Sequence, residues 1–121
     1  MKVRWTRLRS RCRKRGILCT VSFEHLWDQW SSQNGKCFYS DISLIIDFGN
    51  GVSPDSLSID KVEPHLGYID GNVVLAAHRI NTIKHDMTLE EMKAWTPDWY
   101  QRVAMWRRRG LVCCQVAEGD F

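Results

Sequence analysis

Within residues 57–86 the spacing of apolar residues changes from that of strands to that of a helix. Residues 57–62 and 72–77 are short apolar or alternating runs with β-branched side chains, a pattern typical of strands. Proline, glycine and aspartate in residues 63–71 favour a broad turn between the two runs. The pattern therefore predicts a strand, a turn, a second strand and then a helix. The positions with helical spacing in that last element are Ile80, Ile83 and Lys84.

The remaining sequence predicts four more helices, each with a recognisable start or stop signal such as an N-cap, a capping box or a terminal glycine. Their predicted ranges are 2–15, 23–33, 89–95 and 97–109. Residues 42–46 are expected to form a strand or a buried turn, and residues 47–56 a loop. One helix carries an apolar stripe that is expected to be core rather than a ligand site; it consists of Phe23, Leu26, Trp27 and Trp30.

Polar residues of the central stretch are spaced so that they can meet. Asp60 comes near the end of the first predicted strand, and His78, Asn81 and His85 share one face of the helix that follows the second strand. Oxygen and imidazole ligands in this mixture suit Mg²⁺, Mn²⁺, Ni²⁺ or Zn²⁺. The alternative is that these side chains form the solvated outer face of an amphipathic helix.

Positive charge is concentrated at the start of the chain. Residues 1–16 hold eight Lys or Arg and no acid, so the remainder has nine basic and 14 acidic residues. A basic segment with an interleaved Trp is typical of nucleic-acid contacts, and duplex DNA is the expected partner. A disordered solubilising tail or a solvated helix face is the alternative. The candidate nucleic-acid-binding residues are Arg4, Trp5, Arg7, Arg11, Lys14, Arg15 and Lys84.

Length and composition set the broad class. A chain of 121 residues with six Trp predicts one domain with a modest core. No apolar run reaches the length of a membrane span, and the charged N-terminus lacks the apolar segment of a secretory signal. The five cysteines form no regular framework, which indicates a reducing, cytoplasmic location.

Several short motifs together resemble the HNH (His-Me finger) nucleases, in particular a phage-associated branch. They are SIDKVE at 58–63, LGY at 66–68, GNV at 71–73 and NTIKHD at 81–86. Weaker matches lie upstream, at KRGI (14–17) and GKCFYS (35–40), and downstream at TLEEM (88–92). The resemblance covers most of residues 8–93, and the order and spacing of the motifs carry it.

The resemblance implies an α+β fold: a ββα-metal core with a two-stranded antiparallel hairpin and flanking helices. It also implies roles for individual residues. Asp60 matches the first acidic metal ligand, Asn81 matches a ligand on the helix, and His85 falls where some relatives have a second helical ligand. Asn72 matches the asparagine that ties the loop together and orients the site. The ion is expected to be Mg²⁺, Mn²⁺ or Ni²⁺.

The chain departs from the family pattern at Lys61, where active enzymes usually place the histidine that activates water. An unperturbed lysine stays protonated at neutral pH, so Lys61 is expected to hold a phosphate rather than accept a proton. His78 or His65 is then the candidate base. The cysteine pairs that bind zinc in many relatives are also incomplete, because their positions hold Ser40, Ala77 and Ile80, which argues against a structural zinc.

The sequence thus predicts a basic N-terminal arm or helix (1–16), an HNH-like domain (17–110, with its ββα core at 57–86) and a tail (111–121). The expected activity is metal-dependent endonuclease cleavage of DNA phosphodiesters. The alternative is an HNH scaffold that has lost catalysis and binds nucleic acid, or a host protein that it inhibits. Lys61 is the feature that favours this alternative.

Overall fold

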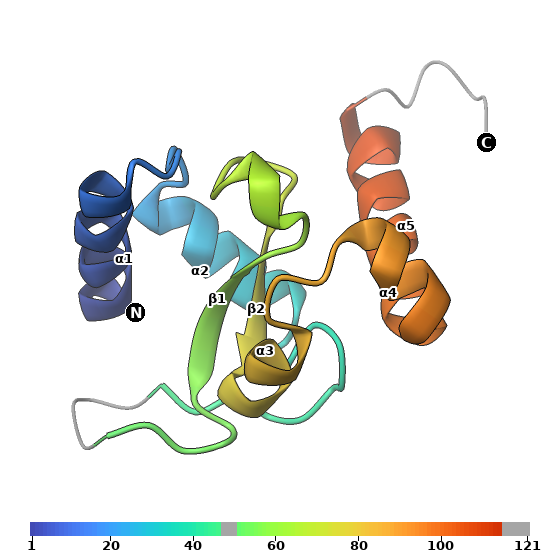
Figure 1. The fold of residues 1–121 in the computed structure, drawn as a ribbon, viewed down its shortest axis with the longest axis horizontal. Helices are drawn as coiled ribbons and strands as arrows, with labels where there is room; N and C mark the ends of the chain where they lie inside the picture. The colour runs from blue at the N-terminus through green and yellow to red at the C-terminus, as the bar shows by residue number, and fades with distance from the viewer. Residues whose placement is uncertain (47–50, 115–121) are drawn as a thin grey trace.

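The computed structural model describes residues 1–46 and 51–114, the last five of these by their backbone alone. It is an α+β structure with a two-stranded antiparallel sheet and flanking helices, as the sequence predicts (Figure 1). The elements in chain order are α1 (Lys2–Arg15), α2 (Phe23–Ser32), β1 (Leu57–Lys61), the 3₁₀ helix η1 (Pro64–Leu66), β2 (Val73–Ala77), α3 (His78–Lys84), α4 (Leu89–Trp95) and α5 (Pro97–Cys114).

Two predicted boundaries need correction. The last helix continues through Gly110 to Cys114, so the tail expected from residue 111 begins inside a helix. Residues 42–46 form neither a regular strand nor a simple turn, because Ser43 and Ile45 make only isolated bridges, to Lys36 and Ser56. Residues 47–50 of the predicted loop lie outside the described part of the chain.

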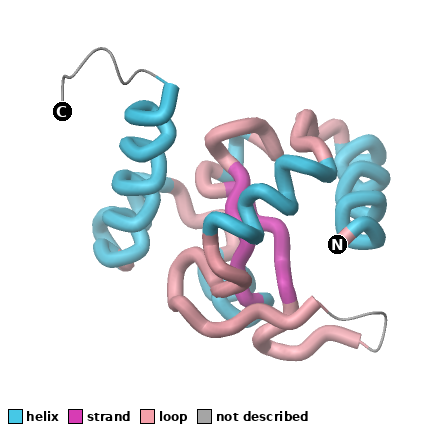
Figure 2. The backbone as a smooth tube through the Cα atoms, turned by 180° about the vertical axis from the view of Figure 1, so that it is seen from behind, coloured by secondary structure: helices cyan, strands magenta, loops and turns pink. Residues whose placement is uncertain are grey.

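The hairpin forms the centre of the molecule. Leu57 pairs with Ala77 and Lys61 with Val73, and every residue of β2 is buried. The two figures that view the molecule from opposite sides show α2 across one face of the strands and α3 against the other (Figures 1 and 2). A two-stranded hairpin is at best marginally stable alone, so it depends on these helices.

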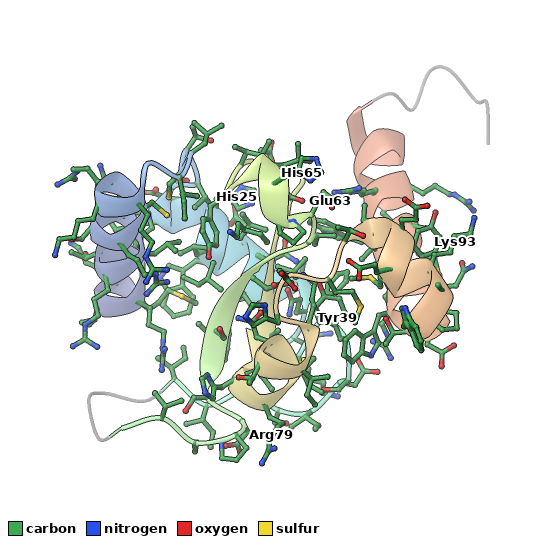
Figure 3. All side chains as sticks on the ribbon, in the orientation of Figure 1. His25, Tyr39, Glu63, His65, Arg79 and Lys93 are labelled. Carbon is green, nitrogen blue, oxygen red and sulfur yellow. The ribbon has the colours of Figure 1, made fainter. Side chains whose placement is uncertain are left out.

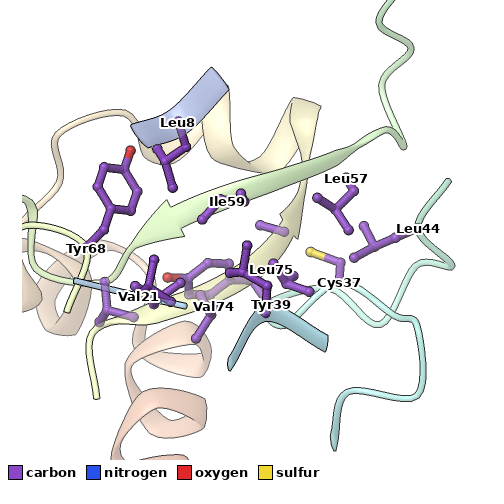
Figure 4. Packing of buried hydrophobic residues seen from close by; sticks show 14 of the residues in the cluster. Leu8, Val21, Cys37, Tyr39, Leu44, Leu57, Ile59, Tyr68, Val74 and Leu75 are labelled. Carbon is purple, nitrogen blue, oxygen red and sulfur yellow. The ribbon is translucent and has the colours of Figure 1, made fainter. Parts of the chain in front are cut away.

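Helix α1 belongs to the folded domain and is not a detached arm. Leu8 and Cys12 are 1% and 2% exposed and join the core cluster, together with Met1. Leu8 packs near Tyr68 and the strands (Figure 4). The indole of Trp5 donates to the Val21 carbonyl over 3.1 Å, which fixes the helix to the segment that follows it.

The apolar stripe of α2 was expected to be core, and three of its four residues lie in or against the core cluster. Leu26 is fully buried, but Trp27 is 38% exposed. The aromatic rings of α2 continue the packing from α1, with Trp5 and Phe23 centroids 5.8 Å apart and Phe23 and Trp27 6.3 Å apart.

The carboxyl-terminal helices α4 and α5 pack against each other, and α5 also packs on the segment before β1. The capping box of α4 has both predicted contacts, from Thr88 and Glu91. Helix α5 packs its aromatic side chains against residues 38 and 39, with Trp106 5.5 Å from Phe38 and Trp99 5.1 Å from Tyr39 between ring centroids. Across the described residues, no helix is long and apolar enough to cross a membrane.

The turn after β1 is anchored to the segment that follows α1. Tyr68 donates its backbone N–H to Leu18 and accepts from Thr20 and Val21. Gly67 makes this approach possible, because its φ of +82° and ψ of −170° lie in a region that side chains avoid. A Cβ on Gly67 would lie 2.6 Å from the Leu18 carbonyl oxygen.

This close approach predicts a difference between two glycines of the same turn. Gly67 and Gly71 both have φ of +82°, but a Cβ at Gly71 would meet nothing within 4 Å. Gly71→Ala should therefore cost only backbone strain, about 1–2 kcal/mol of unfolding free energy. Gly67→Ala should cost at least ~1 kcal/mol more, since backbone atoms must move apart. Urea unfolding of both variants measures the difference, and equal losses would contradict this account of the turn.

Candidate functional site

The predicted ligand Asp60 lies in the interior, where two side chains hold its carboxylate. The Tyr39 hydroxyl donates to Oδ2 over 2.6 Å, and the Lys84 ammonium lies 3.3 Å from Oδ1. Lys84 also donates to the backbone carbonyl of Lys61 over 2.8 Å. Asp60 is 4% exposed and Lys84 is 1% exposed. The three side chains come from β1, from α3 and from the segment before β1, so they join parts of the chain that are distant in sequence. Figure 3 labels Tyr39, the member from the segment before β1.

Burial dominates the electrostatics of this triad. Removal from water raises the pKa of Asp60, and the nearby Lys84 and the Tyr39 hydroxyl only partly offset it. Burial and the neighbouring carboxylate together raise the pKa of Tyr39 well above its usual value. The Tyr39 hydroxyl therefore stays protonated at neutral pH and can donate a hydrogen bond.

Asn81 lies close to the triad on the same face of the hairpin. Ser58 and Asp60 are two residues apart on β1, so their side chains point to one side, towards α3. Asn81 donates to the Ser58 hydroxyl over 2.6 Å, one helical turn from the Lys84–Asp60 contact. The structure thus places two of the three predicted ligands, Asp60 and Asn81, on the face of β1 that α3 covers.

His85 does not join them. It follows the last residue of α3 with φ of +48°, and its side chain is 79% exposed. Its Nδ1 lies 3.2 Å from the carboxylate of Asp86, which is also at the surface. The turn that ends α3 separates His85 from the interior position of Asp60.

These positions do not fit a divalent ion as the sequence predicts it. The Lys84 ammonium lies 3.3 Å from Oδ1 of Asp60, and a second cation at the same oxygen would be repelled. The other oxygen accepts the short bond from Tyr39. The site as folded therefore has a protein ammonium in contact with the carboxylate that was predicted to hold the metal.

The candidate catalytic side chains lie apart from Asp60. Lys61 is adjacent on β1 and so points to the opposite face, with its ammonium 5.2 Å from the centre of the Tyr68 ring. His65 is on η1, where its Nδ1 lies 3.3 Å from Glu63 (Figure 3). His78 is exposed at the start of α3, and its backbone N–H donates to Ser56.

Asn72 is the most completely bonded polar residue of the turn. It is 1% exposed; its Oδ1 accepts from the Glu63 N–H over 2.8 Å, and its Nδ2 donates to the carbonyls of Glu63 and Gly67. These contacts close the turn between the strands. Arg107 of α5 also reaches this turn, at 3.3 Å from the Gly71 carbonyl and from Asn72 Oδ1.

The predicted nucleic-acid contacts fall into two groups. Arg7, Arg11, Lys14 and Arg15 are exposed on α1 and, with Ser10, line a shallow depression of about 290 Å³. Arg4 and Trp5 are half-buried on the same helix. Lys84 must be withdrawn from the set, because its ammonium is inside the protein and bonded to Asp60.

Sequence reasoning missed the role of Tyr39 and that of Lys84. Lys84 did carry a signal, since a lysine in the apolar stripe of a short helix indicates either a snorkelling side chain or a buried ion pair. Tyr39 carried no comparable signal. Its segment has no regular secondary structure, so no periodicity assigns its side chain to a face.

The buried pair predicts a large effect of removing one partner. Lys84→Met should lower the free energy of unfolding by about 3–5 kcal/mol, because it leaves an unpaired buried carboxylate. Adding Asp60→Asn should restore much of the loss, as the charge is then gone. Urea unfolding is the measurement, and Lys36→Met, at an exposed lysine, is the control. Equal losses in Lys84→Met and the control would exclude a stabilising pair.

The raised pKa of Tyr39 predicts an alkaline effect. Above about pH 10 the unfolded chain releases the Tyr39 proton while the folded chain keeps it, so stability falls as pH rises towards the folded pKa. Tyr39→Phe removes this dependence and also the bond to Asp60. The variant should be less stable than the wild type at neutral pH, with a gap that narrows above about pH 10. A gap that stays constant in unfolding experiments would count against the buried hydroxyl.

Comparison with known proteins gives one partial match. No protein-family profile matches the chain. A stretch of 45 residues, 37% of this chain, is 38% identical to part of the "Uncharacterized 29.0 kDa protein in dda-modA intergenic region" of Enterobacteria phage T4. The match spans 18% of that phage protein. The similarity is to a short segment of a protein whose printed name states no activity.

Proposed function

We propose that this chain is a DNA-binding protein on an HNH-like ββα scaffold that has lost metal-dependent cleavage. The observation that carries the proposal is the buried contact of Lys84 with Asp60. In the resemblance, Asp60 is the first metal ligand. The Lys84 ammonium supplies positive charge to the Asp60 carboxylate. Asp60 therefore does not need a metal ion for that purpose.

The scaffold part of the proposal has two supports. The order β1, turn, β2, α3 is that of a ββα core, and the partner helix lies on the face that carries Asp60 and Ser58. Asn72 closes the turn through three hydrogen bonds, as the resemblance implies for the asparagine at this position. The similarity to a T4 protein supports a phage origin.

The binding part rests on charge. Helix α1 has basic residues along its length and no acid, and most of its cations are exposed. Lys61 lies half-buried at the end of β1 and could add a phosphate contact to the same surface. Duplex DNA, a dense polyanion, is the partner that this distribution matches.

A metal-dependent endonuclease remains the second candidate, and one observation favours it. Asn81 lies on the face of β1 that carries Asp60, with its amide bonded to Ser58, two residues before Asp60. This candidate requires the Lys84 ammonium to leave Asp60 when DNA and Mg²⁺, Mn²⁺ or Ni²⁺ bind. His78 or His65 would then have to act as the base.

A plasmid assay separates the two candidates. We expect wild type to retard supercoiled plasmid in a gel but not to nick it with Mg²⁺, Mn²⁺ or Ni²⁺. Lys61→His should not create nicking, because the Lys84 ammonium already lies against the Asp60 carboxylate that would hold the ion. Lys84→Gln removes the internal ammonium and tests whether an ion can then bind at Asp60. This variant should also leave the plasmid intact, because the candidate catalytic side chains lie apart from Asp60.

Nicking by the wild type that Asp60→Asn abolishes would overturn the non-catalytic proposal and support the endonuclease. In that case His78→Ala and His65→Ala identify the base, since only one of them should then stop the reaction. Absence of any gel retardation by wild type at low salt would overturn the DNA-binding proposal itself.

A further inference from the structure

The exposed surface of α1 is organised in stripes. A helix advances about 100° per residue, so the side chains that are buried, Leu8 and Cys12, mark one line along it. The opposite line holds Val3, Thr6 and Ser10, at i, i+3 and i+7. Val3 is 61% exposed and Thr6 is exposed, while Ser10 is partly covered. The most outward line of this basic helix therefore carries only short, uncharged side chains.

Cations flank this line on both sides. One row, the first cation row, is Arg7, Arg11 and Lys14; the other, the second cation row, is Lys2, Arg9 and Arg13. All six side chains are exposed. Members of the second row lean towards aromatic rings, with Arg9 4.8 Å from the centre of the Trp5 ring and Lys2 6.0 Å from that of Phe23.

This arrangement matches the major groove of B-form DNA. The groove is about 12 Å wide, admits one α-helix, and is bounded by two phosphate backbones. A helix lying in it needs short side chains towards the base edges and cations towards each backbone. Helix α1 is about 21 Å long and stands at one edge of the molecule, with its outer side clear of the other elements (Figure 1).

We propose that α1 binds lengthwise in the major groove of duplex DNA, with one cation row on each phosphate backbone. Thr6 and Ser10 can hydrogen-bond to either kind of base pair, and Val3 can contact a thymine methyl group. The central line lacks the Arg, Asn or Gln side chains that discriminate bases strongly, so affinity comes mainly from phosphates and sequence preference is weak. Duplex RNA does not fit, because its major groove is too deep and narrow.

The inference deepens the proposed DNA binding and rests on it, but it is independent of cleavage. The first test uses fluorescence anisotropy of a labelled DNA duplex at several salt concentrations. Substituting all three residues of one row by Gln should reduce the slope of log affinity against log salt by up to about 2.7, and the same should hold for the other row. The charge-matched control replaces three exposed cations elsewhere, Lys36, Arg79 and Lys93, by Gln and should leave the slope unchanged.

The two-row geometry makes the salt test decisive. If only one row changes the slope, α1 lies against a single backbone and the groove assignment is wrong. If neither row changes it while the wild type still binds DNA, another surface binds and the inference fails while the proposed function survives. If the wild type does not bind DNA at all, both fail. Circular dichroism and thermal melting check that each Gln variant is folded, as expected for exposed helix positions.

The second test addresses the groove directly. Methyl green, a major-groove ligand, should displace the wild-type protein, and netropsin, a minor-groove ligand, should not. Thr6→Trp adds bulk without charge at the centre of the short line and should weaken binding by roughly tenfold or more. Thr82→Trp, at an exposed position on α3, is the control. Displacement by netropsin alone, or equal affinity for an RNA duplex, would overturn major-groove binding.

Discussion

The contact between Lys84 and Asp60 joins the helix of the central unit to its first strand, and much of the structure depends on it. A hairpin of two strands cannot stand alone, so α3 must be held against it. Lys84 does this with two bonds, one to the Asp60 carboxylate and one to the Lys61 carbonyl. Tyr39 brings a third segment to the same carboxylate, and α5 in turn packs on Tyr39 through Trp99. A single buried charge pair thus connects four parts of the chain.

This pair also constrains the chemistry. A buried carboxylate needs a compensating positive charge, which can be an ion or a side chain. Here the compensation is internal, so the residue that the resemblance identifies as a metal ligand has a structural role in the fold. Near this pair, Asn81 bonds to Ser58, and Asn72 closes the turn between the strands. The proposal of DNA binding without cleavage rests on this internal compensation.

The basic segment has the opposite character, because most of its charged side chains are exposed. Leu8 and Cys12 fix α1 to the core, and this leaves the other sides of the helix to the cations. Truncation of residues 1–15 would remove core side chains as well as charge. For that reason exposed cations must be replaced individually to learn what the charge does. The fold holds α1 rigidly at one edge, and such a helix can enter a groove as a preformed element with little loss of entropy.

The sequence by itself determined the elements and their order, because apolar periodicity, caps and turn residues act locally: the hairpin, α2 and α4 were predicted within a residue or so of their observed bounds. It also located the excess charge of α1 and an asparagine suited to closing the turn. Only the tertiary structure decided which polar groups meet. Tyr39 reaches Asp60 across 21 residues and Lys84 reaches it across 24, and no local pattern encodes such contacts. His85 carried the right spacing yet lies at the surface, because the turn that ends α3 carries it away from the buried carboxylate.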